Sequence, residues 1–451
     1  MWPGVAAADL DGDGTREVVV VQASQMAVLS AAGTLRAGWP QAPFGASEMR
    51  TLAVADLDAD GTAEILTARA SGGSDETWTV LEPNGATRDG WPRLDPLDPG
   101  YAWGAYNQNL AVGDLDGDGT LEVAASSDVH YLAAFADDGT PLPASDRYGA
   151  GKNWSQVGVH YDDAVDLRGY ANCDPGVPPL EARPNFADAP PAVGDLDGDG
   201  TNEIVVVGSF YDCRTVDYQQ LFQVPMIFRA DRTRWAASGF DWTTPPVPDA
   251  SAAPLSIDYD VIESAEANPV LADLDGDGVK EILHASYDGR VHAYWLDRTE
   301  HGAWPFDVNL DSTVLRFASE PVVADLDGDG KGEVLFTTWT AKGSNQRGDL
   351  FIVDSNGAEL ARVPLPASAS DWDGALAAPT VAQLDGDPAM EVVVNTAHTG
   401  LVAYEIPGSA SAKPRWATGR GNVSRTAPEP GAALVGAIAI ATLATRFRRR
   451  R

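Results

Sequence analysis

The sequence contains few of the side chains that most enzymes use for catalysis. Its 451 residues include only two cysteines and six histidines. Neither the G-x-S-x-G motif of serine hydrolases nor the H-E-x-x-H motif of zinc peptidases occurs. The one candidate catalytic cluster is His160 with the residues that follow it, Tyr161, Asp162 and Asp163. The composition therefore argues against the common hydrolytic mechanisms.

Basic residues are scarce as well. The chain has 31 Lys and Arg against 66 Asp and Glu, which gives a formal net charge of −35. This charge repels phosphate groups and argues against nucleic acid or anionic lipid as a partner. The first ten residues, MWPGVAAADL, have neither the basic nor the apolar region of a signal peptide. Because the C-terminus indicates export, we expect the open reading frame to begin upstream of Met1.

What the sequence has in abundance is a repeated acidic motif. The pattern D-Φ-D-x-D-G-x-x-E, in which Φ is apolar, begins at Asp9, Asp56, Asp114, Asp195, Asp273 and Asp325. A seventh, altered copy begins at Gln383 and has Pro388 in place of the glycine. The starts are 47, 58, 81, 78, 52 and 58 residues apart. This spacing fits a four-stranded unit of roughly 45–50 residues with insertions.

The residues around each motif are typical of β-strands. A short apolar stretch precedes the first aspartate, and a β-branched run such as EVVVV at 17–21 follows the glutamate. Turn signals such as PNGA at 83–86 come next, and GWP or AWP often ends the unit, as at 38–40. This order is one propeller blade, and seven units predict an all-β, seven-bladed β-propeller.

The motif also predicts a metal site. In a tight loop, positions one, three and five turn their carboxylates inward, position seven offers a carbonyl, and the glutamate at nine completes an oxygen cage suited to Ca²⁺. Glycine at position six permits the positive φ of the turn. The sequence predicts about six calcium sites, and the seventh loop is predicted to be empty. The predicted ligands are Asp9, Asp11, Asp13, Thr15 and Glu17; Asp56, Asp58, Asp60, Thr62 and Glu64; Asp114, Asp116, Asp118, Thr120 and Glu122; Asp195, Asp197, Asp199, Thr201 and Glu203; Asp273, Asp275, Asp277, Val279 and Glu281; and Asp325, Asp327, Asp329, Lys331 and Glu333. The alternative is a solvated acidic turn without an ion.

Repeats such as DLDGDGTREV and DLDGDGTLEV resemble FG-GAP/VCBS repeats, the calcium-loop blades of the seven-bladed propeller in integrin α chains and many bacterial surface proteins. The resemblance covers residues 1 to about 420. It implies a Ca²⁺ ion in each loop between the first and second strands, which stiffens the blade. The chain departs from the pattern in the seventh loop and at Ala59, which replaces a glycine.

The C-terminus resembles a PEP-CTERM sorting signal. Pro428, Glu429 and Pro430 precede the apolar stretch 431–445 and the sequence RFRRRR. The resemblance implies cleavage by exosortase-type machinery, with a membrane-held tail before processing; a plain membrane anchor is the alternative. We expect a propeller over 1–420, a linker over 421–430, and a hydrophobic helix with an arginine-rich tail over 431–451. These segments predict an exported protein of the bacterial cell surface or extracellular matrix.

The long insertions are predicted to lie on the face opposite the acidic loops, because strand direction alternates within a blade. Cys173 and Cys213 fall in two of these insertions, which predicts a disulfide in an exported protein; two buried thiols are the alternative. The same face collects aromatic residues that could bind a glycan or a matrix protein, or simply hold the loops in place. The predicted binding residues are Trp154, Tyr161, Tyr170 and Trp242.

Together these features predict a calcium-stabilised surface or matrix propeller that binds a glycan or protein and performs no chemistry. The alternative is a calcium-dependent polysaccharide lyase or another carbohydrate-active enzyme on the same propeller, with His160 or its neighbouring aspartates governing turnover. Arg347, Gly348 and Asp349 match an RGD adhesion motif. We interpret that match as an ordinary turn before the strand LFIVD, because such short motifs arise by chance.

Overall fold

The computed structural model describes residues 4–426 apart from 72–75, 95–99, 102–103, 107–109, 175–180, 188, 216–218, 310–313, 341–345 and 368–373. The described residues are mostly strand, and the two α-helices among them are short: α1 (Asp163–Arg168) and α2 (Tyr259–Ile262). The prediction of a β fold is therefore confirmed in this coarser form. No helix in this part of the chain has the length and apolar character needed to cross a membrane.

Seven sheets of three or more strands follow one another along the described chain, and each acidic loop joins two strands of one sheet. The first three sheets are β1 (Val5–Ala8), β2 (Glu17–Gln22) and β3 (Gln25–Leu29); β4 (Ala53–Ala55), β5 (Glu64–Ala68) and β6 (Trp78–Leu81); and β7 (Leu110–Gly113), β8 (Glu122–Ser126) and β9 (Leu132–Phe135). The fourth and fifth are β10 (Arg183–Asn185), β11 (Ala192–Gly194), β12 (Glu203–Asp212) and β13 (Gln219–Phe228); and β16 (Val270–Ala272), β17 (Glu281–Ala285), β18 (Arg290–Tyr294) and β19 (Phe306–Asp307). The sixth is β20 (Arg316–Ala318), β21 (Val322–Asp325), β22 (Glu333–Thr340), β23 (Asp349–Val353), β24 (Glu359–Pro364) and β28 (Lys413–Trp416), and the seventh is β25 (Thr380–Ala382), β26 (Met390–Thr396) and β27 (Gly400–Ile406). A small hairpin, β14 (Ala236–Ala237) with β15 (Phe240–Asp241), lies between the fourth and fifth sheets in sequence.

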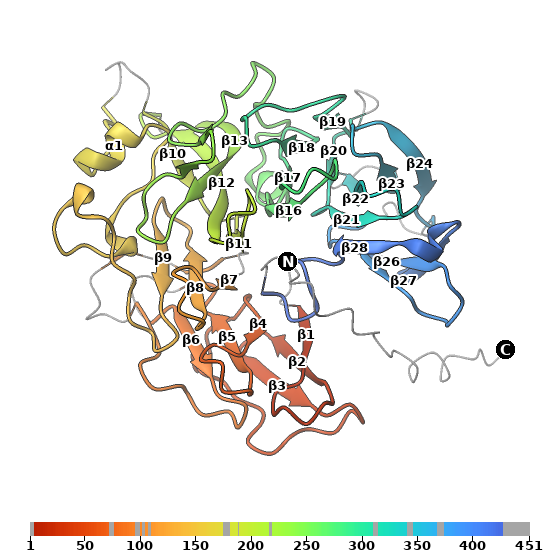
Figure 1. The fold of residues 1–451 in the computed structure, drawn as a ribbon, viewed down its shortest axis with the longest axis horizontal. Helices are drawn as coiled ribbons and strands as arrows, with labels where there is room; N and C mark the ends of the chain where they lie inside the picture. Colours follow the sequence, from red (N-terminus) through yellow and green to blue (C-terminus); the bar gives the residue numbers. More distant parts are fainter. Residues whose placement is uncertain are drawn as a thin grey trace.

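The sheets are arranged around a central region, in chain order (Figure 1). Their strands pair antiparallel. The innermost strands β1, β4, β7, β11 and β16 each contact the next one around this centre. Strands β5, β8 and β17 are buried along their whole length, because neighbouring sheets cover both of their faces.

The tryptophans of the GWP and AWP motifs join the first, second and fifth sheets to the sheet that follows each. The indole Nε1 of Trp39 donates to the carbonyl of Pro83 (3.0 Å), that of Trp91 to Asp137 (3.2 Å), and that of Trp304 to Ser355 (3.0 Å). Each acceptor belongs to a turn of the following sheet. A Cβ at Gly38 would overlap the carbonyl oxygen of Asn84, so the glycine before Trp39 is needed for this close approach.

Residues 413–426, the central segment, lie in the central region around which the sheets are arranged (Figure 1). Strand β28 pairs with β21, and the segment then continues past the innermost strands of other sheets. Its carbonyl oxygens accept backbone N–H groups from Val381 at Ala417 (2.8 Å), Ala7 at Val423 (2.9 Å), Val54 at Ser424 (2.9 Å) and Val112 at Thr426 (2.9 Å). Residues 421–426, which the sequence analysis places in a linker, thus contact the first three sheets in the structure.

Side chains of the central segment are anchored by one carboxylate. Glu320, 7% exposed, accepts hydrogen bonds from the indole of Trp416 (3.3 Å), the backbone N–H of Arg420 (2.7 Å) and the amide of Asn268 (2.7 Å). Trp416 exposes none of its surface. The guanidinium of the buried Arg420 also donates to the carbonyl of Leu110 (3.4 Å). The centre is therefore filled by a bonded polar and apolar core.

Candidate metal sites and binding face

The six intact acidic loops share one hydrogen-bonded conformation. In each loop the glutamate at position nine accepts the backbone N–H of the leucine at position two, at 2.6 Å for Glu122 and Leu115 and at 3.1 Å for Glu17 and Leu10. The same bond occurs in the other four loops. These leucines are at most 7% exposed, as expected of a side chain that points into the sheet core. Core packing therefore fixes the glutamate.

In each intact loop the side chain of the first aspartate accepts hydrogen bonds from backbone N–H groups later in the loop. Asp9 accepts the backbone N–H of Gly14 at 2.7 Å, and Asp195 accepts that of Gly200 at 2.9 Å. Gly14 and Gly200 have φ of 85° and 90°, which glycine adopts without strain. Ala59 in the second loop has φ of 58°, a left-handed conformation that costs a non-glycine residue about 1 kcal/mol. The loop conformation is thus kept despite the substitution.

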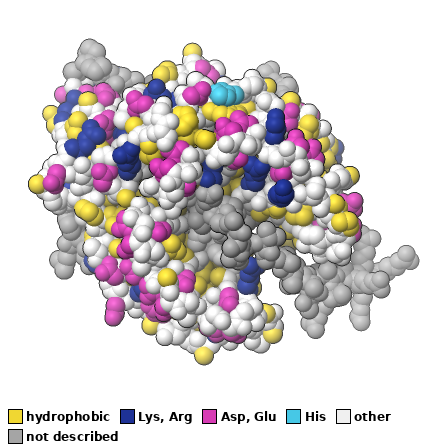
Figure 2. Space-filling view, in the orientation of Figure 1, with side chains coloured by type: hydrophobic (Ala, Val, Ile, Leu, Met, Phe, Trp, Pro, Cys, Tyr) yellow, Lys and Arg dark blue, Asp and Glu magenta, His cyan; other side chains and the backbone are white. Residues whose placement is uncertain are grey.

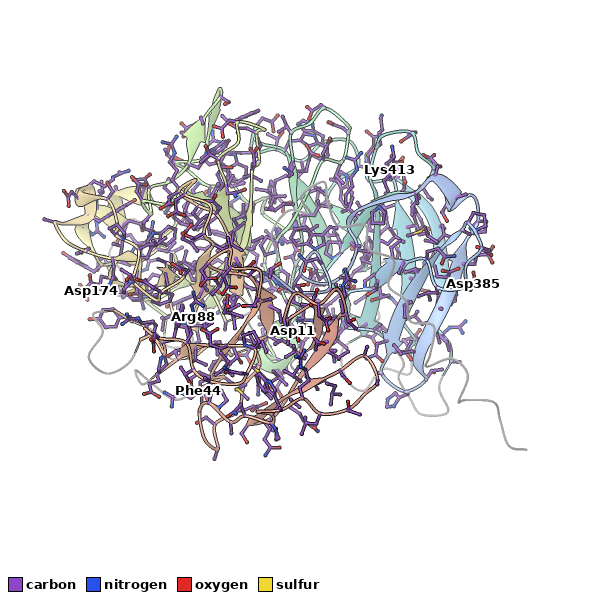
Figure 3. All side chains as sticks on the ribbon, turned by 60° about the horizontal axis from the view of Figure 1, so that its bottom comes forward. Asp11, Phe44, Arg88, Asp174, Asp385 and Lys413 are labelled. Atoms are coloured by element: carbon purple, nitrogen blue, oxygen red, sulfur yellow. A yellow bond between two sulfur atoms is a disulfide. The ribbon has the colours of Figure 1, made fainter. Side chains whose placement is uncertain are left out.

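This conformation brings carboxylates together. One oxygen from each member of a group lies within 4.8 Å of the others, as in Asp56, Asp58 and Glu64, or Asp273, Asp275 and Glu281. The third loop has the same kind of group, and in the first and fourth loops the group consists of three aspartates. Figure 3 labels Asp11, in the loop of the first sheet, and Asp385, in the altered loop of the seventh sheet. An all-oxygen cluster of this kind could hold a hard divalent cation.

Burial disfavours the ionised form of the glutamates at position nine when no cation is bound. It raises the pKa of Glu64, Glu122 and Glu203 to about 7 and that of Glu281 to about 8. The pKa of Glu333 is raised for the same reason. In the third to sixth loops the neighbouring aspartates add to the shift, because like charges disfavour ionisation. A bound cation would remove this penalty.

Some buried carboxylate oxygens in these loops accept no hydrogen bond. They include Oε1 of Glu281, whose side chain is fully buried, and Oδ2 of Asp197. Oε1 of Glu64 also accepts none, although Nη1 of Arg88 lies 3.5 Å away. Buried polar atoms normally have a partner, so these oxygens fit the role of metal ligands.

The first two loops also have an arginine beside them. Arg36 pairs with Asp11 at 2.5 Å and with Glu17 at 2.9 Å. Arg88 pairs with Asp58 at 2.7 Å. These guanidinium groups neutralise part of the loop charge. Acidic side chains elsewhere are spread over the visible surface and do not form a single patch (Figure 2).

Neighbouring loops are joined directly to one another. The backbone N–H at position eight of one loop donates to the carbonyl of the leucine at position two of the preceding loop. These bonds run from Ala63 to Leu10 (3.1 Å), Leu121 to Leu57 (2.8 Å), Lys280 to Leu196 (2.9 Å) and Gly332 to Leu274 (2.9 Å). The side chain of Asn202 links the fourth loop to the carbonyl of Asp114 in the third (2.7 Å). The residue type at position eight differs from loop to loop, so the sequence does not predict that this position links neighbouring loops.

The altered seventh loop keeps part of the conformation. Leu384 donates its N–H to Glu391 at 2.7 Å, as in the intact loops. Gln383 replaces the first aspartate, and its amide oxygen accepts the N–H of Gly386 at 3.1 Å. The first carboxylate is thus replaced by a neutral group.

Two of the four predicted ligand-binding aromatics are buried, and their assignment was wrong. Trp154 is 1% exposed and Trp242 is 0% exposed. Their indole groups donate to the carbonyls of Ala230 (2.8 Å) and Leu296 (2.9 Å), so both hold loops against the core. Tyr161 is half-buried, with its hydroxyl bonded to Pro246, whereas Tyr170 is 65% exposed. The aromatic residues in the insertions therefore mainly serve packing.

The catalytic cluster suggested by the sequence is also structural. His160 is fully buried, and its Nδ1 lies 2.9 Å from Asp166, which Arg234 contacts at 3.1 Å. Asp162 caps α1 by accepting the N–H of Ala164. Asp163 pairs with Arg147. These groups fasten the insertion to the fourth sheet and leave His160 out of contact with solvent.

Three predictions remain, and they concern the two cysteines, the RGD sequence and the C-terminal tail. The structure joins Cys173 and Cys213 by a disulfide with a Cα–Cα distance of 5.2 Å. Asp349 of the RGD sequence is 5% exposed and pairs with Arg362 at 2.7 Å, so the sequence is not displayed for adhesion. Pro428, Glu429, Pro430 and residues 431–451 lie outside the described residues.

Comparison with known proteins identifies FG-GAP-like repeats at residues 9–67 and 273–336. No curated protein matches the chain. The chain is similar to the Dos1 propeller, with 9% identity, coverage of 88% of this chain and 77% of that chain, and a TM-score of 0.39. It is also similar to the V. cholerae biofilm matrix protein Bap1 (15% identity, 90% and 77% coverage, TM-score 0.35) and to rhamnogalacturonan lyase YesW (15% identity, 93% and 69% coverage, TM-score 0.35). At these TM-scores the three structures carry no argument about ligands or activity.

Proposed function

We propose that this FG-GAP-like repeat chain is a calcium-stabilised, seven-bladed propeller that binds glycans or proteins at the bacterial surface or in the extracellular matrix. The observation that carries the proposal is the conformation shared by six acidic loops. In the second, fourth and fifth of these loops a buried carboxylate oxygen lacks a hydrogen-bond partner. Calcium is the favoured ion because the ligands are oxygens, without the His or Cys that zinc and copper prefer.

A binding role without chemistry is supported by the state of the candidate catalytic residues. His160 exposes no surface and Asp162 is committed to a helix cap. A general base must reach the proton that it abstracts, and a buried, paired histidine does not. No observation in the described residues favours the lyase alternative over the binding function.

Calcium content and ligand binding test this proposal together. Elemental analysis of protein purified without chelator should find calcium at up to six ions per chain, and a glycan array should give hits without product release. Protein that contains no calcium and takes up none on titration would contradict the metal sites. Unsaturated sugars released from an acidic polysaccharide would move the protein to the lyase class.

Export and sorting are part of the same proposal. The Cys173–Cys213 disulfide is expected of an oxidising compartment, and the PEP motif with its apolar and arginine-rich tail supports membrane insertion before exosortase-type cleavage. Mass spectrometry of native material should therefore show a C-terminus that lacks residues 446–451. An intact Arg451 would contradict cleavage and leave the plain anchor.

A further inference from the structure

Four extended segments lie side by side on the face opposite the acidic loops. Tyr131 forms a β-bridge with Gly158, and the N–H of Val159 donates to His130 at 2.7 Å. The N–H of Tyr161 donates to Ala182 at 3.1 Å, and Arg183 pairs with Tyr211 between β10 and β12. Residues 130–131, 158–161, 182–185 and 209–211 therefore form one continuous patch of backbone.

This patch is far from the acidic loops. Strand β12 begins at Glu203, in the fourth acidic loop, and Tyr211 is eight residues farther along it. At about 3.3 Å per residue, the two are roughly 26 Å apart. A ligand on this patch would not touch the predicted calcium sites.

Arg183 is an unusual cation in so acidic a protein. Its guanidinium lies 5.6 Å from the ring centre of Tyr211, and its Nε has no hydrogen-bond partner. No ion pair joins Arg183 to a carboxylate among the described residues, whereas Arg214 and Arg168 nearby pair with Asp212 and Glu181. Arg183 is thus left able to bind an anion.

Aromatic rings line the neighbouring segments. Tyr101 is 59% exposed and its ring centre lies 4.9 Å from that of Tyr131, which in turn lies 4.4 Å from His130. Burial, with Arg183 nearby, lowers the pKa of His130 to about 3, so this imidazole stays neutral at physiological pH. The only charge identified on this patch is that of Arg183.

We propose that Arg183, Tyr101, Tyr131 and Tyr211 form a binding site for a carboxylate-bearing sugar, a uronic acid residue of an acidic polysaccharide. The inference rests on the proposed binding function and names its ligand class and site. A guanidinium presents two parallel N–H donors that match a carboxylate, and tyrosine rings pack against the C–H faces of a sugar. Polyphosphates such as nucleic acid are disfavoured by the net charge of −35.

Calorimetric titration with a galacturonate oligosaccharide of defined length, at fixed calcium concentration, tests the site. Wild type should bind the acid more tightly than its methyl ester, which has the same ring without the charge. Arg183→Gln should weaken binding by about tenfold to a hundredfold, the effect of losing a charge-assisted hydrogen bond. The affinity of Arg183→Lys should lie between those of wild type and Arg183→Gln. Tyr101→Ala should also weaken binding.

A matched control separates this site from general effects. Arg214→Gln removes the same charge from a paired arginine just beyond the end of β12, and this variant should bind as wild type does. Equal binding by Arg183→Gln and wild type, equal affinity for acid and ester, or preference for a DNA oligonucleotide would overturn the inference. Binding to neutral glycans only would overturn it and leave the proposed function standing. Binding to no glycan or matrix protein would overturn both.

Discussion

Chelation of calcium with EGTA is expected to lower the melting temperature by about 10 °C or more. A ligand that binds only the folded state at a concentration of one hundred times its Kd adds about 2.7 kcal/mol per site, and several sites are proposed. In the empty loops, the buried glutamates and their neighbouring aspartates repel one another, and in the first two loops Arg36 and Arg88 offset only part of this charge. Thermal unfolding followed by circular dichroism, with calcium restored afterwards, measures the effect.

Two aspartates, one from an intact loop and one from the altered loop, provide the control for this experiment. Asp197→Ala changes an intact loop in which Oδ2 lacks a protein partner. Asp387→Ala changes the altered loop, where Gln383 has replaced the first carboxylate. We expect the first variant to lose much more of the calcium-induced stabilisation. Equal losses, or a melting temperature that EGTA leaves unchanged, would contradict the assignment.

Removal of the central segment should have the second largest effect. A chain that ends at Ala412 loses the buried Trp416 and the backbone bonds to β1, β4, β7 and β25. It also leaves Glu320 buried without two of its donors. Trp416→Ala alone should cost about 3–5 kcal/mol, typical of a buried large-to-small substitution. Urea unfolding should therefore show a lower midpoint for both changes.

Two variants test whether this effect belongs to the central segment. Lys413→Ala changes an exposed residue of β28 and should stay within about 0.5 kcal/mol of wild type. A chain that ends at Ala427 lacks the tail and keeps the segment, so it should unfold at the wild-type urea concentration. If the chain that ends at Ala412 did the same, the central segment would have no part in stability.

The acidic loops could be predicted from sequence because their conformation depends on local residues. A glycine at position six, a leucine at two and a glutamate at nine fix the turn within nine residues. Burial of Trp154 and Trp242 could not be predicted, because an aromatic residue in an insertion has no periodic pattern to show which way it points. The patch around Arg183 could not be predicted either, since Tyr101 and Tyr211 are 110 positions apart in sequence and no repeated pattern marks either residue.

The position of the central segment could not be predicted either, because its contacts join residues far apart in sequence. Arg420 of the segment and Glu320, to which it bonds, are 100 residues apart in sequence, and no repeat marks either residue. The composition of 421–426, GNVSRT, is polar enough to predict a linker. The segment nevertheless lies against the first three sheets, whose backbone N–H groups bond to the carbonyl oxygens of Val423, Ser424 and Thr426.

The position of the central segment also determines how the molecule responds to mechanical tension. A pulling force applied to the chain beyond Thr426 reaches the first three sheets through Val112, Val54 and Ala7, and reaches the sixth through β28. The load is therefore shared among sheets on different sides of the central region, and no single terminal strand has to resist it alone. A protein held by its C-terminus in flowing water would be pulled through a segment that is hydrogen-bonded to several sheets at once.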